Sequence, residues 1–344
     1  MKKFGLIGAG GYIAPSHMQA VQDSGHKVVA VLDPNDSVGI LDRFFPQADF
    51  FVEFERFDRH VDKLKRAGEP IDYISICSPN YLHDAHVRFA LKNGADAICE
   101  SPLVLNPWNV ESLEELEGDT GKRIFSILPL RLSPSFVDLK ERVDQHKDRI
   151  HDVDLTCIHA FGQWYFVSWR GQPEKSGGLV TDMGLPYFDL LIWIFGKIKR
   201  NVVHVMGSRC ASGYLELEKA RVRWFLSANI EDLPDPLRFH DRRLSYSLVV
   251  DGQEMNSLQY PAGLHTKSYW EILNGQGFGL EDARLGIEAA YEMRQSEPIG
   301  VKGDFHPLVH PYKRDGRLND LIRRRSYRPS GVSGIAFDQD IANP

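Results

Sequence analysis

The sequence predicts an α/β protein with two kinds of sheet. A parallel, doubly wound sheet comes first, followed by an α+β part with a mostly antiparallel, open-faced sheet. Strand-like and helix-like segments alternate over roughly the first 125 residues, whereas later strands follow one another with few helices between them. The 344 residues suffice for two domains. We expect domains at 1–128 and 129–300, followed by a basic, irregular tail at 301–344.

Each element of the first part has a local justification. Apolar runs that end in glycine, proline or an acid predict strands, and runs of helical periodicity that end at a glycine predict helices. The expected strands lie at 3–7, 27–33, 71–80, 95–101 and 122–130. The expected helices lie at 15–25, 83–94 and 109–121. Because strand and helix alternate, the sheet should be parallel.

The second part contains longer strands with fewer helices. We expect strands at 152–165, 200–207, 221–229 and 244–252. The apolar stretch PYFDLLIWIFG, at 186–196, and the amphipathic stretch at 281–296 predict helices. This order is typical of an antiparallel sheet packed on a few helices.

Composition excludes several classes of partner. The formal net charge is −6, which gives no general attraction to nucleic acid or to an anionic membrane. No run of 18 apolar residues occurs, so we expect no membrane span. None of the four cysteines belongs to a C-x-x-C pair, which favours reduced thiols in a cytoplasmic protein.

A glycine-rich turn between the first strand and the first helix predicts a dinucleotide site. Gly8 and Gly10 match G-x-G, and Ile13 stands where a third glycine is usual. Such a turn lets backbone approach a pyrophosphate at a helix N-terminus. Asp33, at the end of the second strand, would bind a ribose diol and repel a 2′-phosphate, which favours NAD in a Rossmann domain. The alternative is a glycine-rich turn without a ligand.

A second turn closes the strand at 71–80. Ser78, Pro79 and Asn80 end this strand at the carboxyl edge, where open α/β sheets bind their ligands. The same residue types are also common in ordinary turns, so that alternative stays open.

Several segments together resemble the Gfo/Idh/MocA oxidoreductase family. They are GAGGYIAP, ICSPNYLH, ICESPL and KSGGLVTDMGLPYFDLLIWIFG, and the resemblance runs from Met1 to about Arg294. It is nearest to the branch that oxidises UDP-N-acetylglucosaminuronic acid at its 3-hydroxyl. The resemblance implies NAD as hydride acceptor, a nucleotide-sugar substrate, and a homo-oligomer, tetramer or dimer, formed through the open sheet faces. It also implies these cofactor contacts: Gly8, Gly10, Tyr12, Ile13, Asp33, Ser78, Asn80, His83 and Glu100.

Four positions depart from the pattern of that family. Ser101 stands where the family has a lysine that donates to the reacting hydroxyl, and Pro186 stands where the branch has a histidine base. Pro129 and Val167 also replace expected polar residues, and the resemblance implies that all four positions face the substrate. The residues implied to contact the cofactor are largely retained. Two hypotheses follow: a nucleotide-sugar oxidoreductase, or a redox-impaired relative that binds its ligands, assists an active paralogue or catalyses a non-redox reaction.

Neighbouring residues could replace the missing groups. The candidates for catalysis are Ser101, Asp182, Tyr187 and Asp189, with His83 and His159 as further bases. Each of the three candidates on the 182–189 segment has a structural alternative: helix N-capping for Asp182, core packing for Tyr187, and a structural hydrogen bond for Asp189.

An aromatic and basic cluster predicts contacts to an anionic sugar nucleotide. Aromatic rings can stack on a uracil, and arginine pairs with phosphate or carboxylate. The candidates are Trp164, Tyr165, Trp169, Arg170, Arg131 and Lys175. A surface or interface role is the alternative. We expect no metal site, because prolines argue against the helix that His306 and His310 would need to share a metal.

Overall fold

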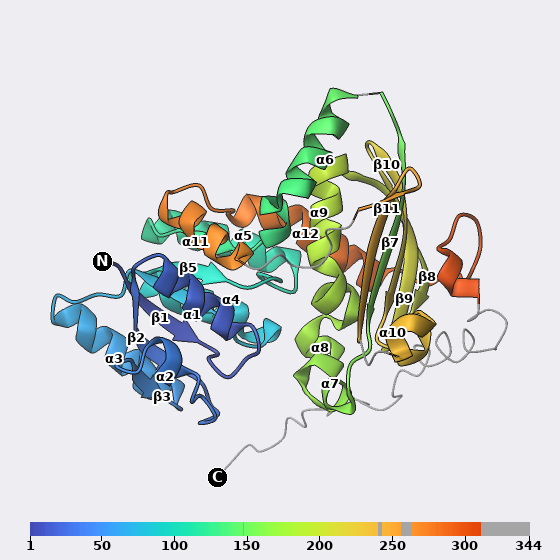
Figure 1. Cartoon of the computed structure of the whole chain (residues 1–344). Helices are drawn as coiled ribbons and strands as arrows, with labels where there is room; N and C mark the ends of the chain where they lie inside the picture. The colour runs from blue at the N-terminus through green and yellow to red at the C-terminus, as the bar shows by residue number, and fades with distance from the viewer. Residues whose placement is uncertain (147, 240–242, 256–262, 311–344) are drawn as a thin grey trace, which may run out of the picture.

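The computed structural model describes residues 1–146, 148–239, 243–255 and 263–310. Two sheets of six strands each organise this part of the chain. Figure 1 shows them side by side, the first at the N-terminal end with helices on both faces, the second covered by helices on one face. This arrangement confirms the predicted fold class of a doubly wound sheet followed by an α+β part.

The first sheet is parallel throughout, in the order β3-β2-β1-β4-β5-β6. Its strands are β1 (Lys3–Ile7), β2 (Lys27–Leu32), β3 (Asp49–Phe51), β4 (Tyr73–Ile76), β5 (Asp96–Cys99) and β6 (Ile124–Ser126). Its helices are α1 (Ala14–Asp23), α2 (Leu41–Phe44), α3 (Phe54–Arg66), α4 (His83–Lys92) and α5 (Pro107–Thr120). The strand order reverses between β1 and β4, so their carboxyl ends diverge and open a crevice there.

The second sheet has the order β12-β11-β7-β10-β9-β8, and only its β7–β10 pair is parallel. Its strands are β7 (His151–His159), β8 (Ile198–Met206), β9 (Cys210–Leu217), β10 (Ala220–Ser227), β11 (Leu244–Val250) and β12 (Gln253–Glu254). The helices of this part are α6 (Pro134–Gln145), α7 (Gln163–Val167), α8 (Pro173–Ser176), α9 (Leu185–Phe195), α10 (Asp235–Phe239) and α12 (Leu280–Gln295). Alternate side chains of β7, such as Leu155 and Cys157, share a core with α9.

A late helix returns to the first sheet. Figure 1 shows α11 (Leu264–Leu273) beside the helices of the first sheet, although it follows the strands of the second. Tyr269 and Ile272 of this helix are buried in the same core as Phe4 and Leu6 of β1. Residues from the expected second domain therefore complete the first core, and the division at residue 128 stays a prediction.

The segment after β7 differs from the expectation. Residues 163–165, predicted as the end of a strand, belong to the short helix α7 (Gln163–Val167). Aromatic residues favour strands by propensity, but tertiary contacts override that preference here. The Tyr165 ring stacks on Phe161 at 3.9 Å between centroids, and its hydroxyl donates to Asp182. Strand β9 and helix α3 were not predicted. Of the expected tail, residues 311–344 lie outside the described residues.

Within the part of the chain that the structure describes, one helical stretch is long and apolar enough to cross a membrane. It spans Pro173–Phe195, and 78% of its most apolar window is buried inside the protein. A buried core helix passes the same length and composition criteria, so this stretch is weak evidence for a span.

Candidate active site

A cavity of about 2250 Å³ opens at the carboxyl edge of the parallel sheet. Its wall includes the turn after β1 and residues at the start of β11 in the second sheet. Both parts of the molecule therefore contribute to one cavity. It contains the point where the strand order reverses, which is the usual ligand site of open α/β sheets.

The turn after β1 is closed to side chains. Gly8 has a φ of +94°, and a Cβ built there would lie 2.6 Å from the backbone of Cys77 and Ser78. No other residue fits that position without moving the end of β4. The turn thus presents backbone at the start of α1, where the helix dipole favours an anion.

Asp33 fixes this turn from the end of β2. Its Oδ2 accepts from the Gly10 amide at 2.7 Å, and its Oδ1 accepts from the Asn35 amide at 2.8 Å and from the Asn35 side chain at 3.1 Å. A carboxylate offers about four acceptor positions, so one remains for a ribose hydroxyl. The turn and the acid together fit the two features of NAD that this edge must hold, a pyrophosphate and a ribose diol.

His83 ties the ends of β4 and β5 together. Its two ring nitrogens lie 2.7 Å from the carbonyl oxygens of Ser78 and of Pro102. Burial lowers the pKa of His83, against these two bonds, which raise it. The Ser78 hydroxyl lies 2.8 Å from Nδ1 of His86. With both ring nitrogens engaged, His83 acts as a structural bridge in this conformation.

Glu100 ends a buried chain of hydrogen bonds, which we call the Glu100 network: Ser75, Tyr269, His17, Glu100 and His265. Nε2 of His17 lies 2.7 Å and Nε2 of His265 lies 2.9 Å from Oε1 of Glu100, whose Oε2 accepts from the Ser101 amide at 3.2 Å. Burial alone would raise the pKa of Glu100, but the bonds from the two imidazoles lower it below its usual value.

The donors of the Glu100 network all point toward the carboxylate. A carboxylate only accepts, so Nε2 of His17 donates to it, and burial keeps His17 neutral by lowering its pKa. Nδ1 of His17 then accepts from the Tyr269 hydroxyl at 2.8 Å, and Tyr269 accepts from Ser75 at 2.6 Å. The ligand atoms of His17, Glu100 and His265 also lie close enough together to suggest a metal site. Two of their separations, however, are ordinary hydrogen-bond lengths.

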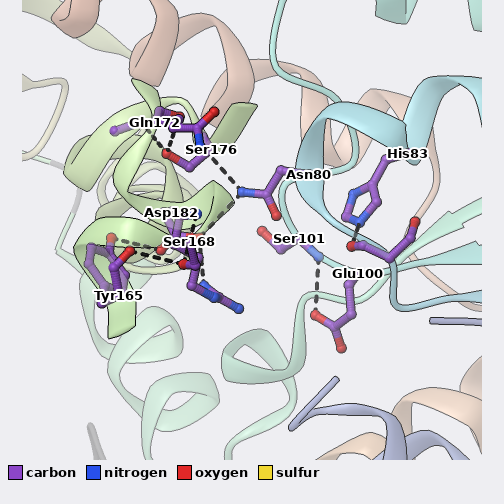
Figure 2. A network of polar contacts seen from close by, with 12 residues as sticks. Asn80, His83, Glu100, Ser101, Tyr165, Ser168, Gln172, Ser176 and Asp182 are labelled. Carbon is purple, nitrogen blue, oxygen red and sulfur yellow. Dashed lines mark hydrogen bonds and ion pairs between the residues drawn. The ribbon is translucent and has the colours of Figure 1, made fainter. Parts of the chain in front are cut away.

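Asp182 lies in a second polar cluster, drawn in Figure 2. Its Oδ1 accepts from Arg170 at 2.7 Å and from the side chain of Asn80 at 3.4 Å, and its Oδ2 accepts from the Tyr165 hydroxyl at 2.9 Å. Asn80 also donates to the Ser176 carbonyl at 3.0 Å, so it links the end of β4 to the second part. The helix N-capping alternative is wrong for Asp182, because a π-helical turn, Val180–Gly184, carries it into α9.

The four departures from the family pattern occupy different environments. Ser101, Pro129 and Pro186 line the cavity, and the Ser101 hydroxyl is buried without a hydrogen-bond partner among the described residues. Val167 is 81% exposed and is not part of the cavity wall. The expectation that all four face the substrate is therefore wrong for Val167.

Asp189 forms a buried ion pair with Arg131. Two hydrogen bonds of 2.7 and 2.9 Å join the guanidinium to the carboxylate, and both side chains are under one-tenth exposed. Burial raises the pKa of Asp189, and Arg131 opposes that shift. The geometry supports the structural alternative for Asp189.

Tyr187 is buried at the cavity wall. It is 3% exposed, and its ring centroid lies 5.6 Å from that of Tyr246 on β11. This position is compatible both with core packing and with contact to a ligand.

Most of the candidate residues share the cavity. All nine expected cofactor contacts line it, as do the four expected catalytic residues. Of the expected substrate contacts, Trp164, Trp169 and Arg170 line the cavity, whereas Arg131, Tyr165 and Lys175 are not part of its wall. Arg131 and Tyr165 instead bind residues of the wall: Arg131 pairs with Asp189, and the Tyr165 hydroxyl donates to Asp182.

Sequence reasoning missed His17, His265 and Tyr269. These residues reach Glu100 and one another across separations of 83, 165 and 252 residues. His17 lies one helical turn beyond the glycine turn, which was a usable local signal. The other two lie on α11, whose return to the first sheet has no local signature.

The glycine turn after β1 lies beside Asp33, which can bind a ribose, and both face the second sheet across one cavity. These features are typical of a two-domain, nicotinamide-dependent oxidoreductase. Comparison with known families agrees. An oxidoreductase family described as having a NAD-binding Rossmann fold matches residues 2–127, and its C-terminal alpha/beta domain matches residues 140–232. The chain belongs to the Gfo/Idh/MocA oxidoreductase family, as the resemblance implied, and NAD is the cofactor of its Rossmann domain.

Solved structures give the same result. The WlbA (WbpB) dehydrogenase from Thermus thermophilus, solved in complex with NAD and UDP-GlcNAcA, is 44% identical with a TM-score of 0.86. The match covers 89% of this chain and 99% of that one. The WlbA dehydrogenase from Bordetella pertussis is 17% identical with a TM-score of 0.70, over 88% of this chain and 98% of that one, and shows the fold alone.

Curated relatives match over shorter stretches. Glucose-6-phosphate 3-dehydrogenase of Bacillus subtilis (strain 168) is 33% identical over 212 residues, which is 57% of this chain and 54% of that protein. Inositol 2-dehydrogenase of Rhizobium meliloti (strain 1021) is 27% identical over 203 residues, 57% of this chain and 55% of that protein. The chain thus spans about half the length of these curated relatives.

Proposed function

We propose that the protein is a NAD-dependent oxidoreductase acting on the 3-hydroxyl of a UDP-N-acetylhexosaminuronic acid or a related nucleotide sugar. The observation that carries the proposal is the single cavity that joins the dinucleotide turn to an aromatic and basic wall. The 44% identical relative, solved with NAD and UDP-GlcNAcA, supports this substrate class.

The residues divide the work along the cavity. Gly8 and Gly10 admit the pyrophosphate, and Asp33 accepts from the adenosine ribose. NAD, when bound, supplies the hydride acceptor. The rings of Trp164 and Trp169 can stack on a uracil. Arg170, which is paired with Asp182, lies in the part of the wall that would contact an anionic sugar.

Pro186 replaces the histidine base that the family pattern implies. Asp182 and Tyr187, on the same segment, line the cavity and could take its place. Asp182 would have to exchange its bonds to Arg170 and Tyr165 before taking a proton. Tyr187 lines the same cavity beside Tyr246 of β11, and we propose it as the other candidate acceptor, in its phenolate form. We place the protein in the cytoplasm as a homo-oligomer, tetramer or dimer. Light scattering that gave a monomer mass would contradict the oligomer.

A second candidate function rests on the sugar side of the cavity. Ser101 replaces a cationic donor, Pro186 replaces a base, and Asp182 and Asp189 are both held in ion pairs. Loss of a positioned general base typically costs about 10² to 10⁴ in rate. A protein that binds NAD and a nucleotide sugar with little hydride transfer fits these observations.

One experiment separates the two functions. The protein is mixed with NAD and UDP-GlcNAcA, and the ultraviolet absorbance of NADH is followed. Turnover at ordinary rates, on the order of 1 to 10³ per second, supports the oxidoreductase. Saturable binding of both ligands without turnover supports the second function, provided that the double variant Ser101→Lys/Pro186→His gains activity.

Val167→Lys is the matched control. It also adds a lysine expected from the family pattern, but at a position 81% exposed and outside the cavity wall. It should leave every rate unchanged. If neither ligand binds to well-folded protein, both functions fail.

A further inference from the structure

The strand order fixes which half of a dinucleotide reaches Glu100. Asp33 directly follows β2, on one side of β1, so the adenosine half lies there. The other half must extend from the turn at Gly8 in the opposite direction, past the end of β4 to the end of β5. Glu100 and Ser101 follow β5 and line the cavity, which places them on the nicotinamide side.

The Glu100 carboxylate is held as an anion by hydrogen-bond donors, whose bonds lower its pKa. It accepts hydrogen bonds from the imidazoles of His17 and His265 and from the backbone amide of Ser101. Its side chain is 17% exposed, so solvent screens the charge only in part. These three hydrogen bonds hold the Glu100 side chain in one orientation, and the Tyr269 hydroxyl in turn holds His17 in place.

The residue next to Glu100 brings no compensating charge. Ser101 is neutral, and its hydroxyl is buried without a partner among the described residues. Arg170, a cation of the cavity wall, is paired with Asp182 at 2.7 Å. Asp182 also accepts from the side chain of Asn80 at 3.4 Å (Figure 2). Of the other arginines in the described wall, Arg43 follows β2 and Arg243 precedes β11.

We propose that this cavity discriminates between the two redox states of its cofactor and binds NAD⁺ in preference to NADH, because the fixed negative charge of Glu100 is not balanced at Ser101. The oxidised nicotinamide ring carries a positive charge and the reduced ring carries none, so only the oxidised ring gains from a nearby anion. This inference deepens the proposed function, and it rests on the NAD binding that the proposed function includes.

The size of the effect follows from elementary electrostatics. A unit charge several ångströms from a charged ring, in a partly buried site, changes a binding constant by roughly tenfold or more. Adding a lysine at position 101 should cancel much of the Glu100 field. It should therefore lower the ratio of the NADH dissociation constant to the NAD⁺ dissociation constant by about that factor.

The test compares Ser101→Lys with Ser101→Met in the full-length protein. The two side chains have similar length, so the pair separates charge from occupied space. Binding of NAD⁺ is measured by calorimetry and binding of NADH by its fluorescence, at one fixed pH for all variants. We expect the lysine variant to lose the preference for NAD⁺ and the methionine variant to keep it.

Glu100→Gln is the complementary variant, which should also lose the preference. If it fails to fold, the lysine and methionine pair still decides the question. Equal ratios in wild type, lysine and methionine variants would overturn the inference while leaving NAD binding intact. Failure of wild-type protein to bind either nucleotide would overturn the proposed function, and this inference with it.

Discussion

His86 shows how a single buried residue couples this fold to pH. Its Nδ1 lies 2.8 Å from the Ser78 hydroxyl at the cavity edge, and burial lowers its pKa from 6.5 to about 4. The folded protein therefore holds His86 neutral over a range in which the unfolded chain binds a proton. Stability contributed by this residue is complete above pH 6.5 and is lost as the pH falls toward 4.

We predict that the free energy of unfolding falls between pH 6.5 and pH 4, with roughly 3 kcal/mol of the fall due to His86. His86→Gln keeps a polar side chain that does not titrate, so its pH slope should be shallower than that of the wild type. Urea unfolding across this range measures both slopes. His159 and His306, whose pKa values burial also lowers to about 4, should leave part of the slope in the variant. Identical slopes would contradict the assignment.

At the scale of elements, one ion pair joins three segments around the cavity. Arg131, in the short helix η2 (Pro129–Leu132), pairs with Asp189 on α9 and donates to the backbone carbonyl of Asp282 on α12 at 2.8 Å. Asp189 was an expected catalytic residue, and Arg131 was an expected substrate contact. Their mutual burial assigns both to holding α9 in place beside the cavity.

Arg131→Met should destabilise the protein by about 3 to 5 kcal/mol, because it leaves the Asp189 carboxylate buried without a partner. The double variant Arg131→Met/Asp189→Leu removes both charges and should recover most of that loss. Urea unfolding at neutral pH gives the three free energies. A double variant no more stable than the single variant would show that the pair itself, rather than an unpaired charge, carries the stability.

Elements with a strong local pattern were predictable from the sequence. The glycine turn and α1, the β-branched run of β2 and the apolar run of α9 each carry their own signal. Helix α7 did not, because WYFV has strand propensity and becomes helical only through the contacts of Tyr165 with Phe161 and Asp182. Val167 was misplaced for the same reason: its exposure depends on how this short helix sits on the fold.

At the scale of the whole molecule, the cofactor side of the site was more predictable than the sugar side. Gly8, Gly10 and Asp33 belong to one local strand–turn–helix–strand unit, so a short window contains the site. The Asp182 cluster joins Asn80, which follows β4, Tyr165 of α7 and Asp182 in the turn before α9, through contacts of up to 102 residues in separation. The Glu100 network depends on the return of α11 to the first sheet, which only the assembled fold reveals.

The two sheets act together because the cavity belongs to both. Asn80 reaches from the first sheet to Ser176 and Asp182, and α11 reaches from the second part into the first core. A nucleotide sugar bound against the second sheet would therefore meet a dinucleotide bound along the first. That meeting depends on one claim: the dinucleotide lies against the turn at Gly8.

Calorimetric titration of NAD⁺ into cofactor-free protein tests that claim, with two glycine variants as a matched pair. Both positions have positive φ, but a Cβ at Gly8 would lie 2.6 Å from backbone, whereas one at Gly25 would meet nothing within 4 Å. We predict saturable binding to the wild type and to Gly25→Ala, and a loss of binding in Gly8→Ala. No saturation in well-folded wild-type protein, or wild-type affinity in Gly8→Ala, would contradict it.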